Sequence, residues 1–245
     1  MKPNDIIDEF VRRARAADGP NLENVTLFGS AVSGDFHEGF SDVNLLCILR
    51  DTSLRALRLL TPVAQWWDRQ KQPPPLCMTR HELERSADVF TIELLDMKRH
   101  HRVLLGEDVL EGLRISMDLH RVQVEYELRE KLILLRRHLL LVADNESRLW
   151  DLLMRSAPSF STLFRHALIA LGDATQTARS EAVEALSRRA GFDPSAMLAV
   201  LHARQHKADR KGTDVYDLAA RYLTTVEKVA AAVDMALDSD ASGHR

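Results

Sequence analysis

The chain has 245 residues, of which 45% are hydrophobic and 28% charged, and its formal net charge is −3. This size allows one large domain or two modest ones with a real hydrophobic core, and the composition is typical of a soluble protein. The slight acidic excess argues against a nucleic-acid binder, which would carry a basic face. No apolar run reaches the ~18 residues of a membrane span, and residues 1–10 lack the apolar core of a signal peptide. We therefore expect a cytoplasmic protein.

The first part of the chain alternates helical and strand patterns. Apolar positions at helical spacing predict helices over residues 4–17, 51–69 and, as a short turn, 80–87. Apolar runs predict strands over residues 25–28, 45–49, 76–78, 90–95 and 103–105. For residues 90–95 a helix that continues to residue 98 is the alternative. Strands that alternate with helices imply a mixed sheet covered by helices.

From residue 116 onward only helical patterns remain. Amphipathic spacing predicts helices over residues 122–142, 149–171, 180–190, 194–201 and 214–237. Pro158 is expected to break or kink the second of these, because proline lacks a backbone donor and clashes with the preceding turn. The change in pattern predicts an α/β domain over residues 1–115 and a helical bundle over residues 116–245.

The chain contains two cysteines, Cys47 and Cys77, each inside an apolar run of strand character. A disulfide or a metal-binding pair is the alternative to two buried thiols. Free cysteine behaves as a small buried hydrophobic residue. We interpret both residues as structural thiols of the core.

A turn of small residues, Gly29-Ser30, follows the first predicted strand. Glycine adopts a positive φ and has no Cβ, so the backbone there can approach a bulky anion closely. Ser30 adds a hydroxyl group and an N–H group at the start of a short helix, where unsatisfied N–H groups attract phosphate. An ordinary strand-to-helix turn is the alternative. We interpret Gly29 and Ser30 as a phosphate-binding element.

Two oxygen-bearing side chains, Asp42 and Asn44, open the second predicted strand. Because side chains alternate along a strand, Asp42 and Asn44 should share one face, with Val43 and Leu45 on the other. Such oxygens beside a phosphate-binding turn can hold a hard divalent cation that also binds the phosphates. Alternatively, Asp42 caps the strand and Asn44 is a hydrogen-bonding scaffold.

This pattern resembles the signature of the polymerase-β-like nucleotidyltransferase superfamily, in which a Gly-Ser turn and a loop lead to Asp-x-Asp at the start of a hydrophobic strand. Gly29, Ser30 and Asp42 match it, whereas Asn44 stands where the second aspartate is expected. The resemblance implies an α+β fold: a nucleotidyltransferase-fold mixed sheet with flanking helices, followed by a C-terminal all-helical bundle. In antibiotic-modifying members of the superfamily, the bundle forms one wall of the acceptor site.

The resemblance also implies a chemistry. In the family, two metal ions bridge a nucleoside triphosphate and the acceptor hydroxyl, and a third carboxylate on a later strand activates that hydroxyl. Asn44 offers Mg²⁺ an oxygen without charge, and one unit charge pair at ~4 Å is worth ~4 kcal/mol at an effective dielectric near 20. A second metal ion should therefore be weakly held. The strand at residues 76–78 carries no carboxylate, so Glu93, in the strand predicted at residues 90–95, is the candidate catalytic partner of Asp42.

Two basic clusters are further candidates for ligand sites. His100 and His101 lie among Lys98, Arg99 and Arg102, where they could touch phosphate or metal. A second cluster contains Arg204, His206, Lys207, Arg210 and Lys211. For both clusters we favour a solvated face, because adjacent histidines point apart and because basic residues near a helix end compensate its dipole.

We therefore expect a nucleotidyltransferase-like protein that binds a nucleoside triphosphate with Mg²⁺. It would transfer a nucleotidyl group to a small-molecule or protein hydroxyl in the cleft between its two domains. The alternative is a catalytically degenerate homologue that senses nucleotide or binds a protein. An RNA-modifying transferase is disfavoured by the acidic balance.

Overall fold

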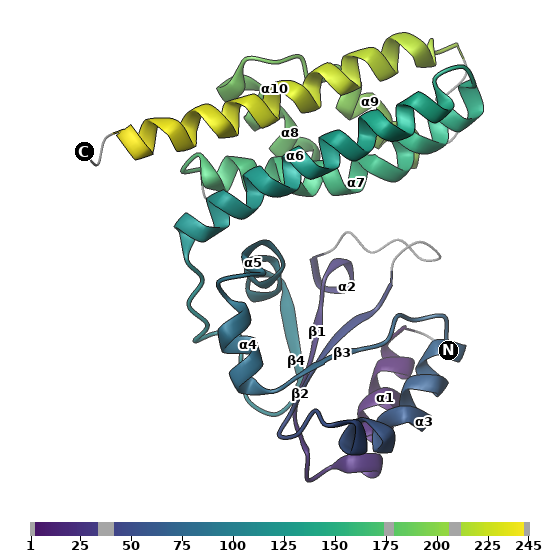
Figure 1. Ribbon diagram of the computed structural model, residues 1–245. Coiled ribbons are helices and arrows are strands. Elements are labelled where there is room, and N and C mark those ends of the chain that lie inside the picture. The colour runs from purple at the N-terminus through teal and green to yellow at the C-terminus, as the bar shows by residue number, and fades with distance from the viewer. Residues whose placement is uncertain (1–2, 34–41, 174–178, 206–211, 243–245) are drawn as a thin grey trace. The chain divides into compact units, whose positions relative to one another are not determined.

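The computed structural model describes residues 3–33, 42–173, 179–205 and 212–242. The chain divides into two compact units, Met1–Ser116 (unit 1) and Met117–Arg245 (unit 2). Figure 1 shows a sheet flanked by helices in unit 1, whereas the described part of unit 2 contains helices alone. The expected α+β fold, with a mixed sheet and C-terminal helices, is confirmed.

Unit 1 is built on a mixed sheet. The strands described are β1 (Leu22–Phe28), β2 (Asn44–Leu49), β3 (Leu76–Met78) and β4 (His101–Leu105). The helices described are α1 (Pro3–Asp18), α2 (Ser30–Ser33), α3 (Leu54–Arg69), α4 (Arg80–Ser86) and α5 (Thr91–Arg99). The strand order is β3-β2-β1-β4, in which β1 is antiparallel to both β2 and β4, and β3 is parallel to β2.

Alternation along β2 sends successive side chains into two separate cores. Leu45, Cys47 and Leu49 are buried with α1 and α3, and there the ring of Trp67 meets that of Phe10 edge-on, with centroids 4.9 Å apart. Leu46 and Ile48 point to the other face, where they are buried with residues of α4, α5 and the segment 109–113. The sheet is therefore covered on both faces, as the alternation of strands and helices implied.

The strand predicted at residues 90–95 is wrong. The segment belongs to α5, in which Leu94 and Met97, three residues apart, are buried beneath the sheet face that carries Leu46 and Ile48. Phe90, the residue expected to begin the strand, is 51% exposed. The periodicity of a short apolar run fits either a strand or a buried helix. Here the two buried residues Leu94 and Met97 are three positions apart, which is the spacing of a helix face.

The edge strand β3 is short and follows three prolines, residues 73–75. The carbonyl oxygen of Pro73 accepts a 2.9 Å hydrogen bond from Trp67 Nε1, which ties the start of β3 to α3. At the other edge, Gly106 ends β4 with φ +82°, and a Cβ there would overlap the backbone oxygen of Glu23. Only glycine therefore lets the chain turn so close to β1.

Unit 2 contains five helices within its described residues. They are α6 (Met117–Val142), α7 (Glu146–Ala170), α8 (Arg179–Ala190), α9 (Ser195–Gln205) and α10 (Val215–Ser242). The interior of the unit is aromatic and aliphatic: Tyr222 and Phe160 are buried, with ring centroids 6.0 Å apart, and the Tyr222 hydroxyl lies 2.9 Å from Ser156 Oγ. Burial raises the pKa of Tyr222.

Pro158 lies inside α7, and the helix is continuous through it, so the expected break is wrong. Proline has no N–H group for the carbonyl of Met154, four residues earlier. The Arg204 side chain donates a 2.9 Å hydrogen bond to that carbonyl oxygen. A side chain of α9 thus replaces the backbone donor that α7 lacks, and Arg204 is a structural residue of unit 2.

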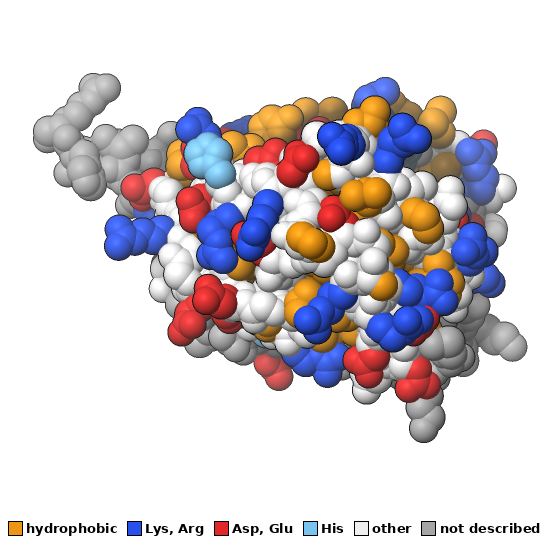
Figure 2. Space-filling view, turned by 90° about the horizontal axis from the view of Figure 1, so that it is seen from below, with side chains coloured by type: hydrophobic (Ala, Val, Ile, Leu, Met, Phe, Trp, Pro, Cys, Tyr) orange, Lys and Arg blue, Asp and Glu red, His pale blue; other side chains and the backbone are white. Residues whose placement is uncertain are grey.

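The surface carries both signs of charge. On the face shown in Figure 2, basic and acidic side chains are interspersed and do not gather into a large region of one sign. Among the described helices, none is long and apolar enough to cross a membrane.

Candidate functional site

The sharp turn at the end of β1 depends on Gly29. This residue has φ +79°, and its carbonyl oxygen accepts a 2.9 Å hydrogen bond from the N–H group of Val32, which starts the short helix α2. A Cβ on residue 29 would lie 3.2 Å from Asn44 Nδ2. The absence of a side chain at Gly29 therefore makes room for both the left-handed turn and the Asn44 amide.

Asn44 and Gly29 meet because of strand register. Asn44, the first residue of β2, pairs with Phe28, and Phe28 pairs with His101 of β4 on its other side. Gly29 follows Phe28 directly, so the carboxyl end of β1 and the amino end of β2 lie together at one end of the sheet. We call this end of the two central strands the β1–β2 edge. The sequence identified these residues but not the pairing that joins them.

Asp42 is placed by its buried neighbour. Val43 is 2% exposed within the core beneath α1 and α3, and its N–H group donates a 2.8 Å hydrogen bond to Gln72 Oε1. Asn44 is half-buried and its side chain lies beside Gly29, whereas Asp42 is exposed just before β2 begins. Gln72 is a residue whose role the sequence did not suggest, because its partner is a distant backbone group.

Ser30 is the first residue of α2, directly after Gly29. It therefore starts from the same edge of the sheet at which Asp42 leads into β2. Residues 34–41, between the two motifs, lie outside the described residues. The backbone arrangement is compatible with one ligand shared by the turn and the Asp42-Asn44 segment.

Two side chains at this edge carry oxygen atoms that a divalent cation can use. Asp42 supplies one carboxylate and Asn44 one neutral amide oxygen. Within the described part of the chain, His, Cys, Asp and Glu side chains form no group of three or more that could hold a metal ion. Mg²⁺ is commonly bound by one or two carboxylates with phosphate oxygens and water completing its shell. The residues therefore fit one Mg²⁺ shared with a phosphate ligand.

Glu93 is not on a strand. It lies in the first turn of α5 and its side chain is exposed. The strand that follows β2 in the chain and pairs with it is β3, Leu76–Met78, which carries no carboxylate. Glu93 is therefore not a carboxylate on a neighbouring strand, which was the reason for choosing it as the third carboxylate. Figure 1 shows α5, the helix that carries it, at the same end of the sheet as α2.

The pair His101 and Asp108 stabilises the chain next to this edge. His101 Nε2 lies 2.8 Å from Asp108 Oδ2, and Nδ1 lies 3.2 Å from the carbonyl oxygen of Lys98. Burial opposes ionisation of Asp108, but bonds from His101 and from the N–H groups of Leu110 and Glu111 outweigh it and lower the pKa of the carboxyl group. The solvated role expected for His101 is therefore wrong.

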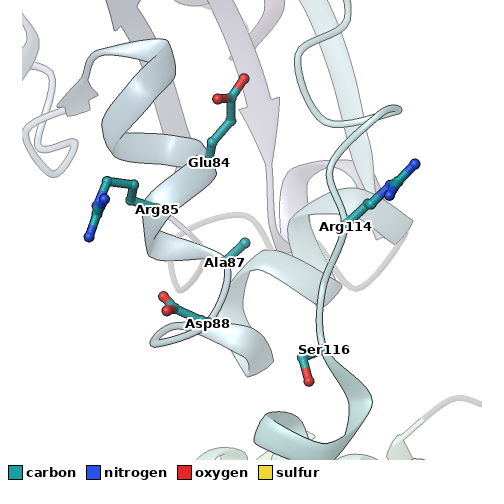
Figure 3. Close-up of a pocket in the computed structure, with 6 residues that line it drawn as sticks. All are labelled: Glu84, Arg85, Ala87, Asp88, Arg114 and Ser116. Atoms are coloured by element: carbon teal, nitrogen blue, oxygen red, sulfur yellow. The ribbon is translucent and has the colours of Figure 1, made fainter.

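A polar pocket of about 350 Å³ lies elsewhere in unit 1. It is lined by Glu84, Arg85, Ala87, Asp88, Arg114 and Ser116. Figure 3 shows the charged side chains of these residues pointing away from one another, so they do not converge on a common point. The pocket contains no residue of the β1–β2 edge and does not form part of the candidate site.

The second basic cluster is described only in part. Arg204 binds the carbonyl oxygen of Met154 within unit 2. The other members, residues 206–211, lie outside the described residues. The described member thus has a structural role.

The first part of the chain matches a family of known proteins. Residues 7–101 match the family model of a nucleotidyltransferase domain, a range that contains the Gly29 turn, Asp42 and Asn44. No curated protein sequence matches the chain significantly.

A solved structure with the same fold is the spectinomycin adenyltransferase from Enterococcus faecialis, crystallised with ATP and spectinomycin. The TM-score is 0.56 at 14% sequence identity, and the match covers 91% of this chain and 99% of the other. At this identity the likeness establishes the fold.

Proposed function

Because residues 7–101 are a nucleotidyltransferase domain of the polymerase-β-like superfamily, we propose that the chain binds a nucleoside triphosphate and transfers its nucleotidyl group to a hydroxyl. The acceptor would be a small molecule or a protein. The observation that carries the proposal is the meeting of Gly29 and Asn44 at the β1–β2 edge, with Asp42 two residues upstream. The relative solved with ATP supports ATP as the first nucleotide to test.

Each residue of the edge has a proposed role. The backbone at Gly29 and Ser30 would bind a phosphate group, since the glycine turn leaves N–H groups open to an anion. Asp42 would provide the anionic oxygen and Asn44 a neutral oxygen to Mg²⁺, which when bound would neutralise charge on the phosphates. The acceptor oxygen would form a bond to the α-phosphorus as the bond to pyrophosphate breaks, and Glu93 is the candidate acceptor of the hydroxyl proton.

Calorimetry with ATP, GTP, CTP and UTP, with and without Mg²⁺, tests the proposal. We expect at least one triphosphate to bind, and Mg²⁺ to increase the affinity. Asp42→Ala should reduce the Mg²⁺-dependent affinity by about tenfold or more, because the anionic ligand is lost. Asp68→Ala, which removes an exposed carboxylate of α3, is the matched control and should have no effect. If none of the four nucleotides binds, the proposal fails.

A second candidate function is nucleotide binding without transfer. Two observations favour it: Asn44 replaces a carboxylate, and β3 carries none. Such a protein would sense nucleotide or bind another protein.

Asn44→Asp distinguishes the two functions. In a weak transferase the added carboxylate should increase Mg²⁺ affinity and pyrophosphate release in the presence of an acceptor. In a pure binder no pyrophosphate should appear before or after the change. Gln65→Glu, on an exposed position of α3, adds the same charge away from the edge and serves as control.

A further inference from the structure

The two cysteines of the chain lie side by side in the sheet. Cys47 of β2 and Cys77 of β3 are register partners in a parallel pair, and both are free thiols. Neighbouring strands lie about 4.8 Å apart. Disulfide-bonded cysteines have Cα atoms about 4.4–6.8 Å apart, so the backbone already has a spacing that a disulfide accepts.

The two side chains also share one face. Cys47 belongs to the core beneath α1 and α3, and Cys77 packs against the same core. Register partners on one face have Cβ atoms that point the same way. The Cβ atoms of the pair therefore do not point apart, a condition that a disulfide requires.

The two thiols differ in exposure. Cys47 is 2% exposed, whereas Cys77 is partly exposed on the edge strand. A hydrogen bond from the Cys47 thiol lowers the pKa of Cys77, and the same bond, together with burial, raises the pKa of Cys47. Cys77 is thus the thiol that an oxidant in solution can reach and that forms the thiolate more readily. Cys47 is the buried thiol next to it.

We propose that Cys47 and Cys77 form a reversible oxidation site, at which a peroxide converts the two thiols into an intramolecular disulfide. This site is independent of the proposed nucleotide chemistry. It revises the interpretation of both residues as purely structural thiols.

The reaction proceeds in two balanced steps. The Cys77 thiolate attacks one oxygen of hydrogen peroxide, the O–O bond breaks, and the released hydroxide takes up a proton to become water. The Cys47 sulfur then attacks the Cys77 sulfenic acid; an S–S bond forms, and hydroxide leaves with the Cys47 proton as a second water. Two thiols are oxidised for each peroxide reduced.

A metal site is the competing use of two thiols. Zn²⁺ in proteins takes four ligands in a structural site and three in a catalytic one. Among the residues that the structure describes, these sulfurs have no third His, Cys, Asp or Glu partner suited to a metal ion. Two thiols alone, side by side on register partners of one strand pair, favour the disulfide.

Peptide mapping of the peroxide-treated full chain tests the proposal. After alkylation of remaining thiols, trypsin should release residues 16–50, which contain Cys47, joined to residues 72–80, which contain Cys77. The joined peptide should be lighter than the sum of its parts by two hydrogens and should separate on treatment with dithiothreitol. Oxidation of Cys77 to a sulfinic acid with Cys47 still alkylated, or a disulfide between two chains, would overturn the proposal.

Single substitutions assign the order of events. In Cys77→Ser, Cys47 should remain fully alkylated at a peroxide concentration that oxidises both thiols of the unaltered chain. In Cys47→Ala, Cys77 should accumulate as a sulfenic acid that dimedone traps. Equal loss of Cys47 alkylation with and without Cys77 would refute the proposed sequence. The mapping of the unaltered chain decides the outcome even if a variant fails to fold.

Discussion

Unit 1 and unit 2 depend on their residues in different ways. In unit 1, single residues hold special positions: Gly29 and Gly106 turn the chain where a side chain would collide, and Gln72 anchors the segment before β2. In unit 2, long helices bury many equivalent apolar side chains, and even an internal proline is accommodated by a side chain from another helix. The residues of the candidate site belong to unit 1, where Gly29 and Gln72 each hold a position that depends on that residue type.

The largest effect should come from Gly106→Ala. The left-handed φ costs about 1–2 kcal/mol for a residue with a Cβ. Relief of the overlap with the Glu23 backbone oxygen costs about 1–3 kcal/mol more. We expect the free energy of unfolding of unit 1 to fall by about 4 kcal/mol. A urea titration in a Trp150→Phe background, where Trp66 and Trp67 of unit 1 report, measures it.

Gly191→Ala is the matched control in unit 2. Gly191 also has a positive φ, +66°, but a Cβ there meets nothing within 4 Å. Its cost should be limited to about 1–2 kcal/mol. If Gly106→Ala and Gly191→Ala lower the free energy of unfolding equally, the overlap with the Glu23 backbone oxygen does not contribute to the cost at Gly106.

Gly29→Ala should have a smaller effect on stability and a specific effect on binding. The positive φ costs about 1–2 kcal/mol, and the new Cβ displaces the Asn44 amide. We expect nucleotide affinity to fall about tenfold in calorimetry, equivalent to about 1.4 kcal/mol. Gly191→Ala should reduce stability similarly without changing nucleotide affinity. Equal nucleotide affinities for the two variants would show that the Gly29 turn does not contribute to nucleotide binding.

Arg204 and Pro158 should be coupled by about 1 kcal/mol. Arg204→Ala removes a hydrogen bond to the Met154 carbonyl oxygen and should cost about 1 kcal/mol. In a Pro158→Ala background the helix supplies its own donor, so the cost of Arg204→Ala should nearly vanish. A double-mutant cycle of unfolding free energies, followed by Trp150 of α7, measures the coupling. Strict additivity would mean that Arg204 does not compensate for the proline.

The smallest effect concerns acid stability. The folded-state pKa of Asp108 is below its ordinary value of 3.8, so the group binds protons more readily when unfolded. Its contribution, below about 1 kcal/mol for this partly exposed side chain, is present above pH 3.8 and is lost as pH falls through the lower folded-state pKa. Asp108→Asn should flatten the dependence of unit 1 stability on pH below 4, as seen in acid titrations. An unchanged slope would show that the bond to His101 does not favour ionisation.

Local patterns were enough to predict most of the fold. Glycine, proline and apolar periodicity act over a few residues, so β2, β3, α3 and the helices of unit 2 could be predicted from the sequence. Residues 90–95 could not, because a short apolar run fits a strand or a buried helix equally until its neighbours are known. The continuity of α7 through Pro158 could not be predicted for a related reason: the Arg204 side chain that bonds to the Met154 carbonyl oxygen comes from another helix.

The candidate site was predicted as residue types and not as contacts. The motif identifies the site residues and the family that it resembles. These residues are Gly29, Ser30, Asp42 and Asn44. The Gly29–Asn44 contact depends on the register of β1 and β2, which the loop between them does not reveal. The bond between His101 and Asp108 and the adjacency of Cys47 and Cys77 likewise arise from tertiary pairing.

The outer edge of the sheet at β3 has a consequence for how the protein behaves in concentrated solution. An edge strand is a template on which another chain can add a strand, and proline at an edge suppresses this because it has no N–H group to donate. Here the exposed edge is Leu76–Met78, and residues 73–75 before it are all proline. So short an edge strand offers another molecule few backbone groups on which to add a strand, which disfavours growth of the sheet from one molecule to the next.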